Sequence, residues 1–280
     1  MPTDPSGIGA VMAVYDRVEA PHLASALDAL VMQTLAPDDV VVVADGHLTA
    51  ELDRVLEDFA LSLPLRVIRL PEHAGSGPAK QAGIEASSTT FVAIVDADDI
   101  SVAHRLQRQR DVLLHEDVDL VGTAMQEFDD ATGEIWGVRR FPGSHEQIMR
   151  AMRTVNPINH PSVAFRRGLA LEAGGYLDLP YLEDYDLWAR MAAHGARLRN
   201  LDEPLVLFRG GGASLIRRRA RGVTRSEWQL QRNLVSYGTV SRPRAVSNFV
   251  ARTAFRMLPS ALMTRSYHRL FLGRDPAEAS

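Results

Sequence analysis

The stretch Thr90-Phe91-Val92-Ala93-Ile94-Val95-Asp96-Ala97-Asp98-Asp99-Ile100 is central to the interpretation of the chain, because an apolar run leads directly into three carboxylates. A short apolar run of this kind predicts a strand that is buried on both faces. Its acids would then lie at the carboxyl end of the strand, where open α/β sheets bind their ligands. Carboxylates this close repel one another unless a cation joins them, and a divalent cation bridging to phosphate does so through oxygen ligands. An acidic turn that caps the next helix is the alternative explanation.

Length and composition describe a globular protein of one or two domains. Of the 280 residues, 46% are hydrophobic and 24% are charged, and the net charge of -4 gives no sign of nucleic-acid binding. The chain has no cysteine, which excludes disulfides and thiolate metal sites and fits a reducing compartment. No signal-peptide pattern opens the sequence, and no apolar run reaches the roughly 18 residues of a membrane-spanning helix. We therefore expect a cytoplasmic protein.

Apolar segments and helical patterns alternate along the first half of the chain. Strands are expected at residues 8–14, 40–43, 65–70 and 118–121, in addition to the acidic strand. Helices are expected at residues 21–34, 52–59, 78–86 and 106–114. This alternation predicts an α/β fold with a mostly parallel central sheet and helices on both faces. Further along, we expect a hairpin or loop at 127–143, helices at 147–152 and 182–193, and short strands at 162–165 and 205–208.

Polar groups follow the predicted strands at four places: Tyr15-Asp16, Asp45-Gly46, the loop from His73 to Lys80, and the acids at 96–99. The carboxyl ends of parallel strands lie along one edge of a sheet. An aromatic ring, a carboxylate, a lysine and an acidic cluster at that edge predict a pocket for a nucleotide diphosphate. Each residue alone has a simpler explanation, such as a half-buried tyrosine, a turn aspartate before glycine, or a lysine on a solvated helix face. The glycine-rich stretches match neither a P-loop nor a dinucleotide fingerprint.

Two acids, Glu183 and Asp184, open the helix expected at residues 182–193. Asp184 is the best candidate for a general base, which must be placed against the hydroxyl that it deprotonates. The alternative is that both acids simply favour the positive N-terminal end of the helix.

Several short motifs occur in the order that one enzyme family uses. They are Val11-Met12-Ala13-Val14-Tyr15-Asp16, Gln33-Thr34, Val42-Val43-Ala44-Asp45-Gly46, His73-Ala74-Gly75 with Ala79-Lys80-Gln81, Val95-Asp96-Ala97-Asp98-Asp99, His160-Pro161-Ser162, Gly174-Gly175-Tyr176 and Glu183-Asp184-Tyr185-Asp186-Leu187-Trp188-Ala189-Arg190. On these motifs, the chain from about residue 8 to residue 214 resembles the family 2 glycosyltransferases with the GT-A fold, especially bacterial enzymes of polysaccharide and cell-surface glycan assembly. Each motif alone is weak, and the ordered set carries the resemblance.

The resemblance implies an inverting transfer of a sugar from a nucleotide-diphosphate donor, expected to be a UDP-sugar, to a hydroxyl of a glycan or lipid-linked acceptor. The residues that would bind the nucleotide are Ala13, Tyr15, Asp45, Lys80 and Asp96. Asp98 would bind a divalent cation, Mg²⁺ or Mn²⁺, and Asp184 would be the catalytic base. Contacts to the acceptor or to the donor sugar would come from Asp99, His160, Glu183 and Trp188.

By the same resemblance, the chain divides into three parts. Residues 1–125 would be the nucleotide-sugar-binding half, 126–215 the acceptor-binding and catalytic half of the same GT-A domain, and 216–280 a basic amphipathic helical tail. Between Trp228 and Arg274 the tail has no acid, and its arginines are interspersed with Phe, Leu and Met. Such a tail suits a helix on an anionic membrane surface, with the protein peripheral on the inner face of the plasma membrane. It equally suits a pair of helices that pack on the catalytic domain with arginine toward solvent.

The chain departs from the family pattern at several positions. Ala13 stands where proline is usual, and Ala44 and His47 alter the segment after the second strand. Lys80 stands where arginine is common, although it is the only lysine in the chain, which favours a requirement for an amine there. Gly211 stands where the family often has a histidine, so we expect weak metal affinity without the nucleotide.

Two other functions were weighed against a transferase. A sugar nucleotidyltransferase also uses an α/β sheet and a metal, but the N-terminal part lacks a glycine-rich loop with arginine and lysine for a triphosphate. A catalytically silent scaffold that binds a nucleotide sugar is supported only by Gly211 and Ala44. The substitution Asp184→Asn separates enzyme from scaffold, because in an enzyme it should abolish transfer and spare donor binding.

Overall fold

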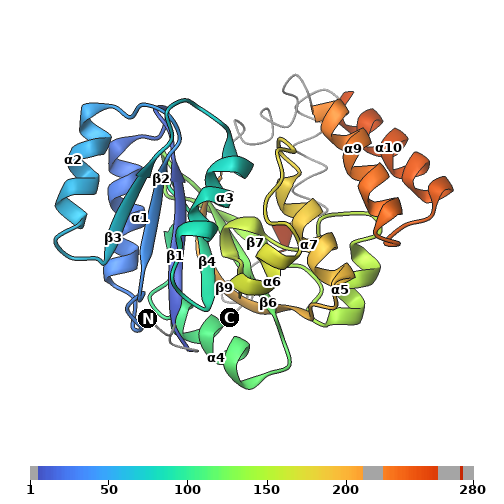
Figure 1. Ribbon diagram of the computed structural model, residues 1–280, viewed down its shortest axis with the longest axis horizontal. Coiled ribbons are helices and arrows are strands. Elements are labelled where there is room, and N and C mark those ends of the chain that lie inside the picture. The colour runs from blue at the N-terminus through green and yellow to red at the C-terminus, as the bar shows by residue number, and fades with distance from the viewer. Residues whose placement is uncertain (1–5, 211–222, 258–271, 274–280) are drawn as a thin grey trace.

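The computed structural model describes residues 6–210, 223–257 and 272–273, and Gly211 lies outside these ranges. The described residues form an α/β fold around a ten-stranded sheet with the strand order β10-β7-β6-β8-β4-β1-β2-β3, while β5 and β9 join it beside this path. Figure 1 shows α2 and β3 at one end of the molecule and helices α9 and α10 at the opposite end. The predicted fold class is confirmed.

The first half of the chain builds the parallel part of the sheet. Its strands are β1 (Ile8–Val14), β2 (Val40–Ala44), β3 (Leu65–Arg69) and β4 (Phe91–Asp96). Strand β1 pairs in parallel with both β2 and β4, and β2 pairs in parallel with β3. All these strands were expected within a residue or so of where they lie, because Val- and Ile-rich runs leave a clear signal. Strands β1, β2 and β4 are buried on both faces, whereas β3 is only partly buried.

Helices cover both faces of this parallel part. They are α1 (Ala20–Val31), α2 (Ala50–Phe59), α3 (Ser76–Ala86) and α4 (Arg105–His115). Alternate strand residues point to opposite faces, so Met12 and Val42 pack in the core with α1, α2 and α4, while Val11 and Val43 pack in a second core with α3. Helix α2 begins at Thr49, whose hydroxyl accepts a hydrogen bond from the Leu52 N–H.

The second half of the chain extends the sheet with mostly antiparallel pairs. Its strands are β5 (Ile100–Ser101), β6 (Leu120–Asp129), β7 (Ile135–Arg139), β8 (Ala164–Arg166), β9 (Leu198–Gly210) and β10 (Leu272–Gly273). Strands β6 and β7 form the expected hairpin, and β8 lies antiparallel between β4 and β6. Strand β9, by contrast, runs parallel to β6 over nearly its whole length. It begins seven residues before the predicted strand, because its pairing with β6 is a long-range contact that local pattern does not reveal.

The remaining helices lie in the second half and the tail. They are α5 (His145–Ala151), the 3₁₀ turn η1 (His160–Ser162), α6 (Arg167–Glu172), α7 (Glu183–Ala193), α9 (Val223–Ser236) and α10 (Arg242–Met257). The short α6 and β5 were not predicted. Helices α5, α6, α7 and α9 contribute to the same core as α3. Within the described ranges, none of the helices combines the length and the apolar character that crossing a bilayer requires.

Candidate active site

The carboxyl ends of the central strands bring the predicted nucleotide-binding residues to one edge of the sheet. Ala13 at the end of β1 lies opposite Asp96 at the end of β4, and opposite Val43 on its other side. Asp45 follows the last residue of β2 directly. Helix α3, which carries Lys80, packs across β1 and β2. The convergence that the sequence predicted at this edge is therefore present.

Asp45 organises the loop that enters α3. Its Oδ1 accepts a hydrogen bond from the Ala74 N–H at 2.6 Å, and its Oδ2 accepts one from the Gly75 N–H at 3.0 Å. The His73 Nδ1 lies 2.9 Å from the same Oδ2, and the His73 ring lies 5.9 Å from the Tyr15 ring. Oδ2 thus has two partners and Oδ1 has one, so Oδ1 can accept one further hydrogen bond from a donor such as a base N–H.

Lys80 is held in place on three sides although its side chain is almost fully buried. Its Nζ lies 3.2 Å from the Asp96 Oδ1, 3.1 Å from the Ser76 Oγ and 3.3 Å from the His160 Nδ1. Burial alone would lower the pKa of Lys80, but the charges of Asp96 and of Glu183 outweigh burial and raise it. Burial likewise opposes ionisation of Asp96, yet the neighbouring Lys80 charge lowers its pKa. The pair is therefore an ammonium and a carboxylate.

His160 is neutral and has both ring nitrogens engaged. Its pKa is lowered to about 3, first by burial and then by the positive charge of Lys80. Because the Lys80 ammonium can only donate, Nδ1 must accept, and Nε2 carries the proton toward the Tyr176 hydroxyl at 3.1 Å. The ring also packs 6.1 Å from that of Trp188. In this arrangement His160 contacts the Lys80 ammonium and the Tyr176 hydroxyl at the same time.

Trp188 was expected to contact a sugar, but the structure places it in the core. Its side chain has no exposed surface and packs among the rings of His160, Phe165 and Tyr176. The physical reason is its place on α7: the fourth to sixth residues of that helix are fully buried, and the Trp188 ring packs against Phe165 of strand β8. At this position Trp188 packs in the hydrophobic core.

The acids after β4 form a compact cluster. One carboxylate oxygen from each of Asp96, Asp98 and Asp99 lies within 4.8 Å of the others. Asp99 is 3% exposed, its Oδ1 accepts the Arg209 N–H at 2.9 Å, and its Oδ2 is buried with no hydrogen-bond partner. Burial, followed by the charges of Asp98 and Asp96, raises the pKa of Asp99 well above its usual value. An oxygen-only donor set with an unsatisfied buried oxygen fits a hard divalent cation such as Mg²⁺ or Mn²⁺.

Two arginines that the sequence did not single out support this cluster. Arg209 on β9 donates from Nε to the Asp98 carbonyl at 2.8 Å, in addition to its bond to Asp99. Arg105 on α4 is 1% exposed and donates from Nη2 to the Ile94 carbonyl at 2.7 Å. Arg209 falls in a segment that follows the family order, whereas nothing in the sequence marks Arg105, which a local pattern assigns to a solvated helix face.

The candidate base lies on the other side of Lys80. The Asp184 Oδ2 accepts a hydrogen bond from the Asn156 Nδ2 at 2.7 Å, and its Oδ1 accepts the Tyr185 N–H at 2.7 Å. Burial, followed by the charge of Glu183, raises the pKa of Asp184 to about 7. Glu183 itself is 7% exposed, and its Oε2 is buried with no hydrogen-bond partner. A carboxylate that titrates near neutrality is suited to accept a proton during a reaction.

Close packing of α3 against the segment before α7 brings the two halves of the site together. A Cβ at Gly77 would lie 2.5 Å from the Leu177 carbonyl and 3.4 Å from the Glu183 Cβ, so only glycine allows this approach. Nearby, the Gln81 Oε1 accepts the Tyr176 N–H at 2.7 Å. These contacts place the first turns of α3 and α7 side by side, with Lys80 and Asp184 on them.

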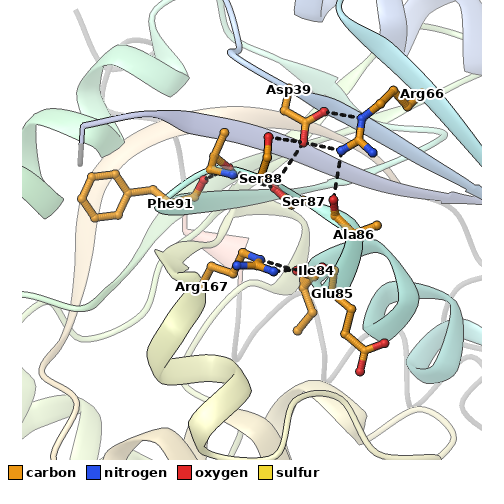
Figure 2. A network of polar contacts seen from close by, with 10 residues as sticks. Asp39, Arg66, Ile84, Glu85, Ala86, Ser87, Ser88, Phe91 and Arg167 are labelled. Atoms are coloured by element: carbon orange, nitrogen blue, oxygen red, sulfur yellow. Dashed lines mark hydrogen bonds and ion pairs between the residues drawn. The ribbon is translucent and has the colours of Figure 1, made fainter. Parts of the chain in front are cut away.

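The far end of α3 is anchored by two arginines, as Figure 2 shows. Arg167 donates to the carbonyls of residues 84 and 85 at 2.6 and 2.8 Å, and Arg66 donates to the carbonyl of residue 86 at 3.0 Å. Arg66 is itself paired with the buried Asp39 at 2.7 Å. Cations at a helix C-terminus satisfy the last carbonyls and favour the helix dipole. The end of α3 away from Lys80 is thereby held in place.

Comparison with known proteins identifies the family. A model of glycosyl transferase family 2 matches residues 10–174. The chain belongs to this family. It is 33% identical over 260 residues to the amylovoran biosynthesis glycosyltransferase AmsE of Erwinia amylovora, covering 92% of this chain and 97% of that protein. It is 27% identical over 271 residues to a UDP-Gal:alpha-D-GlcNAc-diphosphoundecaprenol beta-1,3-galactosyltransferase of Escherichia coli, covering 96% of this chain and 98% of the relative.

A solved structure supports the fold of this family 2 glycosyltransferase. The mannosyltransferase PcManGT from Pyrobaculum calidifontis, in complex with GDP-Man and Mn²⁺, superposes with a TM-score of 0.61. The match covers 96% of this chain and 82% of the mannosyltransferase, at 19% sequence identity. At this identity the likeness concerns the fold.

Proposed function

We infer that this family 2 glycosyltransferase transfers a sugar from a nucleotide-diphosphate donor to a hydroxyl of a glycan or lipid-linked acceptor, with inversion at the anomeric carbon. The observation that carries the proposal is the ion pair of Lys80 with Asp96 of the cluster after β4, at a place where Lys80 also interacts electrostatically with the acidic pair that opens α7. One group suits a diphosphate with its cation, and the other suits a proton acceptor. We take a UDP-sugar as the donor, since the name of the Escherichia coli relative includes UDP-Gal.

The donor end of the reaction uses the edge of β1, β2 and β4. Tyr15, Asp45 and Ala13 would hold the base, with Asp45 accepting from a base N–H while it keeps the loop before α3 in place. Lys80 would contact the nucleotide through its ammonium, and Asp96 would reach the ribose. A divalent cation, when bound, would neutralise charge on the leaving diphosphate, and Asp98 and Asp99 are the residues that would hold it.

The acceptor end uses the first turn of α7. In the proposed step, the acceptor oxygen forms a bond to the anomeric carbon while the bond from that carbon to the diphosphate oxygen breaks, and Asp184 takes the proton of the acceptor hydroxyl. Asn156 fixes one oxygen of Asp184 through its 2.7 Å hydrogen bond, and Glu183 keeps the pKa of Asp184 close to neutrality. Attack from the face opposite the leaving group is what produces inversion.

The first test is a titration of the purified full chain with UDP, GDP and their common sugar conjugates, with and without Mn²⁺. Binding of one nucleotide that strengthens with Mn²⁺, and that loses this dependence in Asp98→Asn, is the expected result. The matched control is Asp58→Asn, which removes an exposed carboxylate on α2. Metal-independent binding in the unsubstituted chain would contradict the proposed cation site.

The second test separates an enzyme from a silent scaffold. Asp184→Asn should abolish sugar transfer while leaving donor affinity within about twofold, because Asp184 lies on the acceptor side. If the unsubstituted chain binds a nucleotide sugar but transfers it to no hydroxyl, and Asp184→Asn changes nothing, the scaffold alternative replaces this proposal. Membership in family 2 already argues against a sugar nucleotidyltransferase.

A further inference from the structure

The outer surface of the two tail helices carries an unusual combination of apolar and basic side chains. We call it the α9–α10 face and define it by Trp228, Val246, Val250 and Met257, which are 47%, 54%, 59% and 81% exposed. On α10, positions 246, 250 and 257 are spaced by four and seven residues and therefore share one side of the helix. The Trp228 ring of α9 meets the Phe249 ring of α10 edge-on at 5.3 Å, which joins the two helices across this surface.

Packing among the residues that the structure describes does not explain this face, because the helices use their other sides to bind the domain. Leu230 and Leu234 of α9 belong to the main core, and α9 contacts α7. The Asn248 Nδ2 on α10 donates to the Arg153 carbonyl at 2.9 Å and lies 3.3 Å from the Gln231 Oε1. Helices α9 and α10 are therefore packed on the catalytic domain, as one of the two alternatives for the tail described. The outer side of the pair has no packing partner among the described residues.

The arginines of helices α9 and α10 divide into two groups. Arg252 and Arg256 turn inward and pair with the fully buried Glu227. These two arginines therefore differ from those of a packed helix pair that face solvent, because a buried carboxylate must be neutralised and they do so. Four others, Arg225, Arg232, Arg242 and Arg244, are exposed.

Three of the exposed arginines lie along the apolar stripes, whereas Arg244 lies on another side of α10. On α9, positions 225, 228 and 232 share one side of the helix, with Trp228 between Arg225 and Arg232. On α10, Arg242 precedes Val246 by one helical turn. Helices α9 and α10 together have six arginines and one glutamate, a net charge of +5, in a chain whose net charge is -4. The positive charge is thus concentrated at one end of the molecule, which Figure 1 shows opposite α2 and β3.

We propose that the α9–α10 face docks on the surface of an anionic lipid bilayer, with Trp228, Val246, Val250 and Met257 at the level of the headgroups and the exposed arginines on lipid phosphates. Charge complementarity selects this occupant, since exposed apolar side chains among arginines are the signature of interfacial helices on anionic lipid. An uncharged apolar partner would leave the arginines unpaired. A tryptophan at the centre of the stripe suits the interface, where amphipathic rings accumulate.

The docking face is connected rigidly to the candidate base. The Asp186 Oδ1 on α7 accepts hydrogen bonds from the Asn233 Nδ2 of α9 at 2.7 Å and from the hydroxyl of Tyr237, the residue directly after α9, at 3.1 Å. Asp186 lies half a turn beyond Asp184. A chain docked by α9 and α10 therefore holds its acceptor side at a set distance from the bilayer. This consequence rests on the proposed lipid-linked acceptor, whereas docking itself requires no catalysis.

The test is sedimentation of the full chain with vesicles of phosphatidylcholine alone and with 30% phosphatidylglycerol, without donor or acceptor. We expect binding only to anionic vesicles, weakening as salt rises. The double variant Arg232→Ser/Arg242→Ser should bind at least tenfold more weakly, because each arginine contributes about fivefold. The double variant Val246→Ser/Val250→Ser should also bind anionic vesicles about tenfold more weakly. The matched controls, Arg54→Ser and Leu61→Ser, remove an exposed arginine and an apolar side chain that is 90% exposed at the opposite end, and should bind normally.

Tryptophan fluorescence gives a second, independent readout. Trp228 is the exposed tryptophan on the face, while Trp188 is fully buried. Vesicle binding should shift the emission to shorter wavelength, and Trp228→Phe should abolish that shift. Binding that is equal for neutral and anionic vesicles, or that survives both double variants, overturns the proposal. Absence of any vesicle binding also overturns it and points to an acidic protein partner. Asp184→Asn should bind vesicles normally, so loss of transfer and loss of docking are distinguishable.

Discussion

Replacing the candidate base should make the protein more stable at alkaline pH while it removes activity. Asp184 has a pKa of about 7, raised mainly by burial and by Glu183. A carboxyl whose pKa is raised in the folded state binds its proton more tightly there than in the unfolded chain. The folded state is therefore favoured most below the unfolded pKa near 4, and it loses stability as pH rises toward 7. Asparagine at position 184 has no proton to lose and escapes this penalty.

The size of the effect follows from the pKa and the hydrogen bonds. Between pH 5 and pH 7, about two pH units, the raised pKa of Asp184 changes the free energy of unfolding by at most about 3 kcal/mol. The Asp184 side chain keeps part of its surface exposed, and solvent screening reduces this to about 1.5 kcal/mol. An asparagine has one acceptor oxygen for two donors, the Asn156 Nδ2 and the Tyr185 N–H, which costs about 1 kcal/mol at every pH. Asp184→Asn should therefore be destabilising at pH 5 and neutral to stabilising at pH 8.

The assay is reversible denaturant unfolding of both chains at pH 5, 6, 7 and 8. The difference in unfolding free energy between Asp184→Asn and the unsubstituted chain should rise by about 1.5 kcal/mol across that range. Asp178→Asn removes an exposed carboxylate six residues earlier and should show no such slope. A flat difference for Asp184→Asn would refute the conclusion that this carboxylate is held in an unfavourable environment. It would also remove the reason to expect transfer activity to rise through neutral pH.

Three further substitutions test the structure around the site. Lys80→Gln should weaken nucleotide binding by about 10- to 100-fold in a titration, because a charge-assisted contact is lost. Gly77→Ala should lower unfolding free energy by about 1–3 kcal/mol, because its Cβ would meet the Leu177 carbonyl at 2.5 Å. Arg190→Lys should cost about 2–4 kcal/mol in denaturant unfolding, because Arg190 donates to Asp186 at 2.7 Å and to the Gly175 carbonyl at 2.6 Å, and an ammonium cannot reproduce this fork.

Each of these has a control of the same chemistry. Arg69→Gln removes an exposed cation, Gly168→Ala adds a Cβ that meets nothing within 4 Å, and Arg197→Lys changes an arginine that is half exposed. All three controls should leave binding and stability within about 0.5 kcal/mol of the unsubstituted chain. If a control variant changes binding or stability as much as the test variant with which it is paired, the specific contact is not the cause of the effect.

The local sequence pattern could not predict which residues far apart in the chain pair with one another. Strand β9 was foreseen only in part, because its first residues pair with β6 some 78 residues earlier in the chain. The assignment of His160 and Trp188 to sugar contacts came from the order of motifs, and it could not reveal that Trp188 is packed beneath His160. Burial of a side chain depends on what the rest of the chain places over it, and period alone cannot supply that information.

The sequence by itself determined the parallel half of the sheet, the acids at the end of β4 and the order of motifs that marks the family, because each is written in a short run of neighbouring residues. Only the tertiary structure decided that Lys80 pairs with Asp96 and also interacts electrostatically with the Glu183-Asp184 pair, that Arg105 and Arg209 brace the acidic cluster, and that two tail arginines turn inward to Glu227. These contacts join residues that are far apart in the chain. Electrostatic interactions and burial depend on how close groups lie in space and not on their separation in the sequence.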